Sequence, residues 1–211
     1  MGEPQILAVL DFEATCWDDD PKRDIVQEII EFPIVLVDVA SQSVVAEFRS
    51  YVKPTLHPKL SKFCTSLTGI TQKQVDEALS FPELFDQVLD FMATYRLFGT
   101  SERKSEQTLR SFYWVTCGDW DLKSMLPLQL QNSGIPQDSR FSSWINIKHC
   151  FTKLYKKKAY GMSSMLEELD LELIGRHHSG LDDSRNIARI VIRMLKDGFK
   201  FNQKVQKRRV R

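Results

Sequence analysis

The apolar run at residues 29–39, IIEFPIVLVDV, limits the possible folds of this chain more than any other segment. It falls well short of the roughly 20 residues that a membrane-spanning helix needs. A bounded apolar run of this length is typical of a buried strand, and Pro33 within it indicates a bulge or an edge position. Similar patterns at 6–10 and 44–52 predict two further strands. We therefore expect an antiparallel meander of three strands.

Helical periodicity follows the meander. Apolar residues three and four positions apart predict most of the later elements as helices. The expected helices cover 71–78, 82–97, 122–130, 161–169 and 183–195, with one more strand at 112–117 and a polar loop at 99–111. Strands followed by alternating helices and a strand predict an α/β fold with a mixed sheet.

Composition excludes several classes of protein. A chain of 211 residues favours one full-sized domain. Its 29 Lys and Arg nearly balance its 28 Asp and Glu, so net charge alone does not predict a nucleic-acid partner. The four cysteines form no CxxC pair, which argues against a zinc site and a disulfide framework. Without a signal peptide or a membrane span, we expect an intracellular protein, in the cytoplasm or the nucleus.

Acidic residues occur at three comparable points of the predicted fold. They follow the first strand, follow the strand at 112–117, and begin the last helix; they are Asp11 and Glu13, Asp119 and Asp121, and Asp182 and Asp183. Taken singly, several of these fit turns or helix caps. Ligands of open α/β sheets, however, gather outside the carboxyl ends of strands. The three points are therefore candidates for one site.

Four carboxylates from three distant segments form an oxygen ligand set that suits Mg²⁺ or Mn²⁺ and does not suit zinc. Two such ions about 3.5–4 Å apart support phosphodiester cleavage. His178 lies five positions before Asp183, and an imidazole can take a proton from the attacking water near neutral pH.

The order of these motifs resembles that of the DEDDh exonucleases of the ribonuclease H-like superfamily, which cleave nucleic acid from the 3′ end. The matching motifs are DFE at 11–13, WD at 120–121 and HSGLDD at 178–183. The longer segments QEIIEFPIVL, FCTSLTGITQKQVD and WINIK are similar to the subfamily of the histone-mRNA and small-interfering-RNA exonuclease and the prion-protein-interacting exonuclease. The resemblance covers roughly residues 5 to 200.

The resemblance implies a ribonuclease H-like fold, with a central mixed five-stranded sheet flanked by helices. We expect the exonuclease domain at residues 1–200 and a basic tail at 201–211. The resemblance also implies a ligand set for two Mg²⁺ ions, with Mn²⁺ able to substitute: Asp11, Glu13, Asp121 and Asp183. Asp11 would contact both ions, Glu13 would hold one ion and meet the terminal nucleotide, and His178 would be the general base.

Two of these assignments depend on the family pattern, because spacing does not decide them. The family places its acid directly after an aromatic residue, which selects Asp121 and leaves Asp119 as a turn residue, or as support behind the ligands. His177 and Asp182 have the same five-residue spacing as His178 and Asp183. The HSGLDDS pattern aligns His178 with the catalytic position.

A terminal nucleotide needs contacts that hold its base. Aromatic stacking contributes about 1–3 kcal/mol per base without sequence preference. The expected nucleotide contacts are Glu13, Ala14, Thr15, Phe63, Trp120 and His178, with Leu67, Thr68 and Gly69 lining the same pocket. Trp120 and Phe63 could equally be packing residues, and we expect Phe12 to point into the core. Gly180 would let the backbone pass close to the site.

Basic residues cluster in two places although the total charge balances. Lys156, Lys157 and Lys158 are possible phosphate contacts, because such clusters attract nucleic acid. The basic tail could bind substrate, direct nuclear import, or remain solvated.

The sequence therefore predicts a metal-dependent 3′-to-5′ exonuclease that releases nucleoside 5′-monophosphates. Its expected partner is nucleic acid with a free 3′ end, single-stranded or in an overhang. RNA is the first choice and DNA stays open. The alternative is a nucleic-acid-binding or interaction module that keeps the fold with little catalysis.

Overall fold

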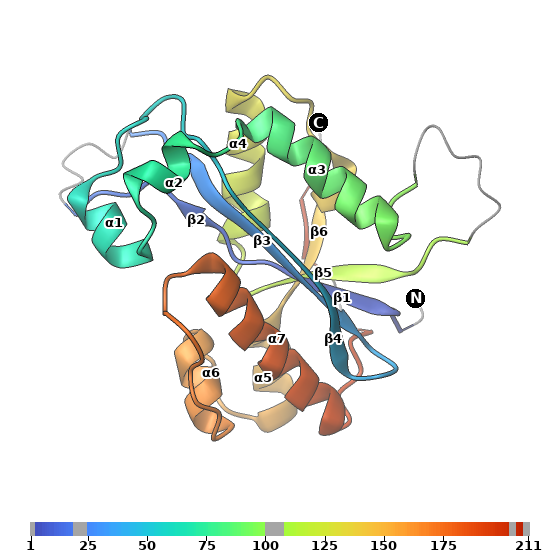
Figure 1. The fold of residues 1–211 in the computed structure, drawn as a ribbon. Coiled ribbons are helices and arrows are strands. Elements are labelled where there is room, and N and C mark those ends of the chain that lie inside the picture. The colour runs from blue at the N-terminus through green and yellow to red at the C-terminus, as the bar shows by residue number, and fades with distance from the viewer. Residues whose placement is uncertain (1–2, 19–24, 100–107, 203–205, 209–211) are drawn as a thin grey trace.

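A mixed sheet runs through the centre of the structure, with helices on both faces (Figure 1). This computed structural model describes residues 3–18, 25–99, 108–202 and 206–208. The elements in chain order are β1 (Ile6–Val9), β2 (Glu13–Ala14), β3 (Ile29–Asp38), β4 (Ser43–Tyr51), α1 (Lys62–Thr68), α2 (Gln72–Asp76), α3 (Phe81–Thr94), β5 (Phe112–Thr116), a π-helical turn (Asp121–Met125), α4 (Leu126–Asn132), a 3₁₀ turn (Ser139–Phe141), β6 (Ser143–Asn146), α5 (Ile147–Tyr155), α6 (Met162–Glu168), α7 (Gly180–Lys196) and β7 (Gln206–Lys207).

The ten-residue strand β3 organises the sheet. Strand β4 pairs antiparallel along one of its edges. Strands β1 and β2 pair antiparallel with successive parts of β3, so the chain leaves the sheet briefly between Val9 and Glu13. Beyond β1, strands β5 and β6 run parallel to it, and β7 pairs antiparallel with β6. Asp11 therefore lies at a break between two strands.

Alternation along the strands gives the sheet two buried faces. Ile6, Ala8 and Leu10 pack with α3 and α4, whereas Leu7 and Val9 pack with α5, α6 and α7. Figure 1 shows α3 and α4 above the sheet, α5 to α7 below it, and α1 and α2 at one end. Both faces are covered by apolar helix surfaces, so the polar residues that remain buried at the strand ends need a separate explanation.

The expected mixed α/β architecture and the antiparallel meander are confirmed. The expected count of five strands was too low, because the sheet formed by the described residues has seven strands. Two of these, β2 and β7, have only two residues each, too few to give a periodic signal. Helix α2 lies within the expected range 71–78 and begins after Thr71, which caps it. Helices α1 and α5 and strand β6 were not predicted as elements.

Two expected segments lie partly outside the described residues. For the loop at 99–111 these are residues 100–107, and for the tail they are 203–205 and 209–211. The rest of the tail contacts the fold, since Phe201 is buried and β7 pairs with β6. The domain boundary at residue 200 stays a prediction. Across the described ranges, each helix is too short or too polar to cross a membrane.

Candidate active site

The break between β1 and β2 places two acidic side chains beside the core. Phe12, between them, is buried, and its ring lies 4.5 Å from that of Phe32, centroid to centroid. The expectation that Phe12 points into the core is confirmed. Its backbone N–H donates to Asp121 Oδ1 over 2.9 Å. This hydrogen bond joins the strand break that carries Asp11 and Glu13 to the turn that carries the third acid.

Asp121 begins the π-helical turn that follows β5. The Leu126 N–H donates to the Asp121 carbonyl, one residue further along than in an α-helix. Pro127 gives a reason for the wider turn, because it has no N–H to donate to the carbonyl of Lys123. Such π turns are frequent at functional sites. Asp121 is buried, with its carboxylate beside the strand break.

Asp119 has a structural role in the same turn. Its Oδ1 accepts hydrogen bonds from Trp144 Nε1 at 2.9 Å and from Asn146 Nδ2 at 3.2 Å. These bonds tie the turn to β6 and to the residue that caps α5. The structure therefore gives Asp119 the turn role expected for it and leaves Asp121 to face the other acids.

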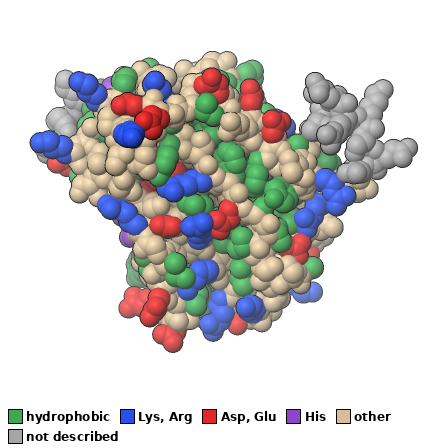
Figure 2. All heavy atoms as spheres, in the orientation of Figure 1, with side chains coloured by type: hydrophobic (Ala, Val, Ile, Leu, Met, Phe, Trp, Pro, Cys, Tyr) green, Lys and Arg blue, Asp and Glu red, His purple; other side chains and the backbone are tan. Residues whose placement is uncertain are grey.

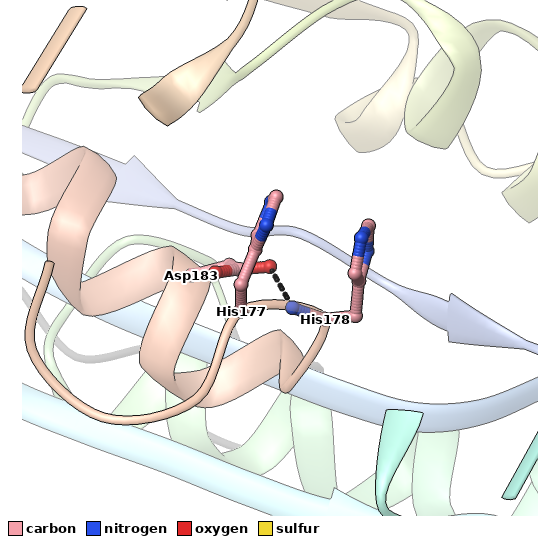
Figure 3. A group of neighbouring side chains, drawn as sticks. All are labelled: His177, His178 and Asp183. Carbon is pink, nitrogen blue, oxygen red and sulfur yellow. Dashed lines mark hydrogen bonds between the residues drawn. The ribbon is translucent and has the colours of Figure 1, made fainter. Parts of the chain in front are cut away.

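The fourth acid lies in the first turn of α7. Asp183 is buried, and its Oδ2 accepts a hydrogen bond from the His178 N–H over 2.8 Å (Figure 3). Its Oδ1 is buried and has no hydrogen-bond partner among the residues that the structure describes. His178 has a φ of 64°, a conformation uncommon for residues other than glycine and often found at functional sites. The Asp183 carboxylate thus holds the strained loop with one oxygen and keeps the other oxygen free for a ligand.

His177 and His178 form a stacked pair above this turn. Figure 3 shows their rings side by side, with centroids 4.0 Å apart. One nitrogen of each ring lies within 4.8 Å of an Asp183 oxygen. The pKa of His178 is lowered by its removal from solvent and by the positive charges of His177 and Arg176. The structure therefore supplies a neutral imidazole near Asp183, and does not by geometry alone choose between the two rings.

The Asp182 carboxylate has other partners and does not face the other acids. Its Oδ2 accepts the Arg176 N–H over 2.9 Å, and its Oδ1 lies 3.5 Å from Arg185 Nη1. These contacts fix the loop before α7. They account for Asp182 structurally and leave Asp183 as the acid that faces Asp11 and Glu13.

The acids form one electrostatic cluster. One oxygen each from Asp11, Glu13 and Asp183 lie within 4.8 Å of one another. Withdrawal from solvent and repulsion by neighbouring carboxylates raise the pKa of Asp11 well above its usual value and that of Glu13 to about 8. Burial raises the pKa of Asp121 and of Asp183 to about 6. Such a grouping is unfavourable without positive charge.

The donor set fits divalent cations. All four side chains offer carboxylate oxygens, which Mg²⁺ and Mn²⁺ prefer. The unpartnered buried Oδ1 of Asp183 points to the same conclusion, because buried polar atoms in proteins are normally satisfied. Asp11, Glu13, Asp121 and Asp183 could therefore hold the metal, as the sequence predicts.

The expected nucleotide contacts differ in exposure. Trp120 and Phe63 are 42% and 36% exposed, so both rings are accessible to a base. Ala14 and Thr15 are buried. The Thr15 hydroxyl accepts the Glu28 N–H over 3.0 Å, which gives this side chain a structural bond. Nucleotide contact by these four residues stays a prediction.

The lysine cluster lies at the turn between α5 and α6. Lys157 pairs with Glu168, and the Lys158 amine lies 4.6 Å from the centroid of the Tyr160 ring. Lys156 ends α5 in a left-handed conformation. Figure 2 shows that basic side chains alternate with acidic ones over the visible face. Phosphate contact by these lysines stays a prediction.

Two charged residues near the site were not predicted from the sequence. Glu31 is fully buried in β3 and opposes Glu13 across the sheet. The sequence feature that could have identified Glu31 is an acidic residue inside an apolar strand, because a buried acid normally needs a partner. Lys148 is the second residue of α5, and its amine would lie 3.9 Å from a Cβ placed on Gly118. The WINIK segment contained Lys148, but nothing in the sequence placed it beside the end of β5.

The raised carboxylate pKa values predict how metal and pH act together. Between about pH 4 and about pH 8 the native cluster binds more protons than the unfolded chain does, so the free energy of unfolding of the metal-free protein falls as pH rises. Bound metal replaces those protons. We expect the increase in Tm on adding Mg²⁺ to be larger at about pH 8 than at about pH 6. Calorimetry at both pH values checks this, and a pH-independent increase would contradict it.

Comparison with known proteins agrees with this geometry. The sequence model of a family described as exonuclease matches residues 8–191. A Rattus norvegicus protein named 3'-5' exoribonuclease 1 is 40% identical over 203 residues, which cover 94% of this chain and 56% of that protein. The chain therefore spans just over half the length of this curated relative.

Two solved structures share the fold over almost the whole chain. The nuclease domain of 3'hExo, described as a DEDDh family member bound to rAMP, is 37% identical with a TM-score of 0.86, covering 98% of each chain. A 3'-exonuclease described as recognising the histone mRNA stem-loop is 35% identical with a TM-score of 0.86, covering 99% of this chain and 92% of the other. The fold and more than a third of the aligned residues are shared. This chain therefore belongs to the DEDDh exonuclease family.

Proposed function

We propose that this protein is a metal-dependent 3′-to-5′ exonuclease that hydrolyses RNA and releases nucleoside 5′-monophosphates. The observation that carries the proposal is the convergence of Asp11, Glu13, Asp121 and Asp183 beside a histidine pair, in a member of the exonuclease family. The resident ions are proposed to be two Mg²⁺, with Mn²⁺ able to substitute. An intracellular location, in the cytoplasm or the nucleus, remains part of the same proposal.

The residues of the chain divide the chemistry among them. When bound, the divalent ions supply positive charge that favours deprotonation of the attacking water and stabilises the leaving 3′-oxygen. Asp11, Glu13, Asp121 and Asp183 hold that charge in place. His178 accepts the water's proton at a ring nitrogen, which its lowered pKa leaves unprotonated near neutral pH. The Asp183 bond to the His178 N–H keeps the base beside the ligands.

RNA is the proposed substrate because of the relatives. The matching rat protein is named an exoribonuclease, and one structural neighbour is described with bound rAMP. Another neighbour is described as recognising the 3′ end of an RNA stem-loop. A free 3′ end in a single strand or overhang is therefore the proposed partner of this site.

The direction of cleavage and the identity of the product test the proposal. The assay uses 5′-labelled single-stranded RNA with a free 3′-hydroxyl, the same RNA with a blocked 3′ end, and DNA of the same sequence. We expect progressive shortening of the free RNA from its 3′ end, nucleoside 5′-monophosphates as products, and no reaction with EDTA. Binding without cleavage would instead favour an interaction module, and internal cuts would contradict exonuclease action. The DNA arm reports whether the site requires the 2′-hydroxyl.

Trp120→Ala and Phe63→Ala test base stacking. Both rings are partly exposed, so truncation removes little core packing. Loss of one stacked base corresponds to about 1–3 kcal/mol, which is about a 5- to 150-fold rise in KM. We expect this rise with a smaller change in kcat, measured by steady-state kinetics on short RNA.

Leu56→Ala, at another exposed apolar residue, is the matched control. It is expected to leave KM unchanged. Equal KM values for Trp120→Ala, Phe63→Ala and the wild type would show that neither ring contributes to nucleotide binding.

A further inference from the structure

We propose that Glu31 and Arg49 are a positioning pair that holds the first turn of α7 against the strand break, so that Asp183 and His178 meet Asp11 and Glu13. The inference rests on the proposed function, because it concerns the assembly of the same metal site. Neither residue belongs to the ligand set. Their effect would be exerted through the start of α7.

Glu31 bonds directly to the beginning of the helix. Its Oε2 accepts the Gly180 N–H over 3.0 Å, and its Oε1 accepts the Leu181 N–H over 3.2 Å. Both amides belong to the first turn of α7, where backbone N–H groups have no partner within the helix. A carboxylate there is also favoured by the helix dipole. Glu31 therefore caps α7 from a neighbouring strand.

Gly180 shows how tightly the helix start is held. A Cβ at this position would lie 2.7 Å from the Asp11 carbonyl oxygen and 3.3 Å from Glu31 Oε2. The close backbone approach expected at Gly180 is therefore confirmed. The start of α7 therefore packs directly against both the strand break and Glu31. Because Asp183 follows Gly180 by three residues and His178 precedes it by two, a shift here displaces both.

Arg49 makes a buried acid tolerable at this point. Its Nε donates to Glu31 Oε1 over 2.7 Å, whereas the Glu31 side chain is fully buried. The Arg49 guanidinium also lies 4.6 Å from the centroid of the Tyr51 ring, and the Tyr51 hydroxyl accepts from Gln74 Nε2 over 2.7 Å. Without this cation, Glu31 would add one more uncompensated charge beside Asp11, Glu13 and Asp183. Glu31 thus caps α7 with a carboxylate, and Arg49 balances the charge of that carboxylate.

Position and charge predict different outcomes. If Glu31 and Arg49 acted on bound metal only through their charges, removing Glu31 would weaken cation binding and removing Arg49 would strengthen it. If they act by placing α7, both removals weaken it. In Glu31→Gln the amide group would present N–H atoms to a donor, either Arg49 or a helix amide. In Arg49→Met the side chain keeps its bulk and loses its bond to Glu31.

The experiment measures Mn²⁺ affinity by electron paramagnetic resonance, together with kcat and KM on RNA at saturating metal. Variants are Glu31→Gln and Arg49→Met, with Glu47→Gln as the matched control. Glu47 also links β4 to α7, through Arg185, but it does not touch the first-turn amides. Removing a group that supports metal ligands costs about 10- to 100-fold in affinity or activity. We expect losses of that size in Mn²⁺ affinity and kcat for both variants, with KM and the control unchanged.

Each result decides the inference. Tighter Mn²⁺ binding by Arg49→Met would overturn the inference in favour of charge alone, and unchanged binding would overturn it by showing that Arg49 does not support the metal site. An equal loss in Glu47→Gln would overturn it by showing general weakening of the β4–α7 contact. Arg49→Met keeps the test open if Glu31→Gln does not fold. If the wild type binds Mn²⁺ but does not cleave RNA, the proposed function fails while the binding comparison still tests the positioning pair.

Discussion

Replacing Asp11 with Asn is expected to abolish RNA cleavage, with kcat lowered by at least about 10³-fold. The substitution keeps the shape of the side chain and removes one of the charges that hold the cations. Because burial and repulsion from neighbouring carboxylates raise the pKa of Asp11, the variant is also expected to unfold at a higher temperature than the wild type without metal. Cleavage of labelled RNA with saturating Mg²⁺ and calorimetry without metal measure the two effects.

Two further variants in the same region make the result specific. Asp121→Asn should lose activity to a similar extent, since its carboxylate belongs to the same cluster. Asp119→Asn should stay close to the wild type. Its amide oxygen can still accept from Trp144 and Asn146, which are the bonds that the acid makes. Wild-type activity in Asp11→Asn or Asp121→Asn would show that the metal assignment is wrong.

Replacing His178 with Ala is expected to lower kcat by about 10²- to 10⁴-fold, the usual contribution of a general base. Mn²⁺ affinity should stay within a few-fold of the wild type, because the carboxylates remain. His177→Ala is the matched control, since its ring is stacked on that of His178 and one of its nitrogens also lies within 4.8 Å of an Asp183 oxygen. A larger loss in His177→Ala than in His178→Ala would exchange their roles.

The pH profile gives independent evidence on His178. The base must be neutral to accept a proton, and the pKa of His178 is lowered from its usual value near 6.5. At saturating metal, the wild-type kcat should therefore rise with pH, with its midpoint below about pH 6.5, and then level off. The same limb should be absent from the residual activity of His178→Ala. Its persistence in the variant would mean that another group is being titrated.

The sequence predicted the parts of the fold that carry strong periodicity. The meander and helices α3, α6 and α7 have apolar patterns that match their burial. Strand β6 has four residues, and β2 and β7 have two each, so they depend on their neighbours in the sheet and carry no pattern of their own. Helix α1 is short as well, and is capped by Ser61, whose hydroxyl accepts the Cys64 N–H.

The acids of the site could be predicted because each follows a strand or begins a helix. What the sequence could not supply was their mutual arrangement. The Phe12 bond to Asp121 joins residues 109 positions apart, and the Glu31 bond to Gly180 joins residues 149 apart. Such contacts come from the assembled sheet. For the same reason spacing alone did not separate His178 from His177, whose rings occupy neighbouring positions above Asp183.

Diffraction from crystals grown with Mn²⁺ and a nucleoside 5′-monophosphate would test the metal site most directly. Anomalous scattering locates the ions independently of any assumption about the ligands. We expect strong anomalous peaks among the carboxylates of Asp11, Glu13, Asp121 and Asp183, with the nucleotide phosphate beside them. Peaks bound only by His177 and His178, or no peak among the four acids, would contradict the proposed metal centre and the exonuclease mechanism built on it.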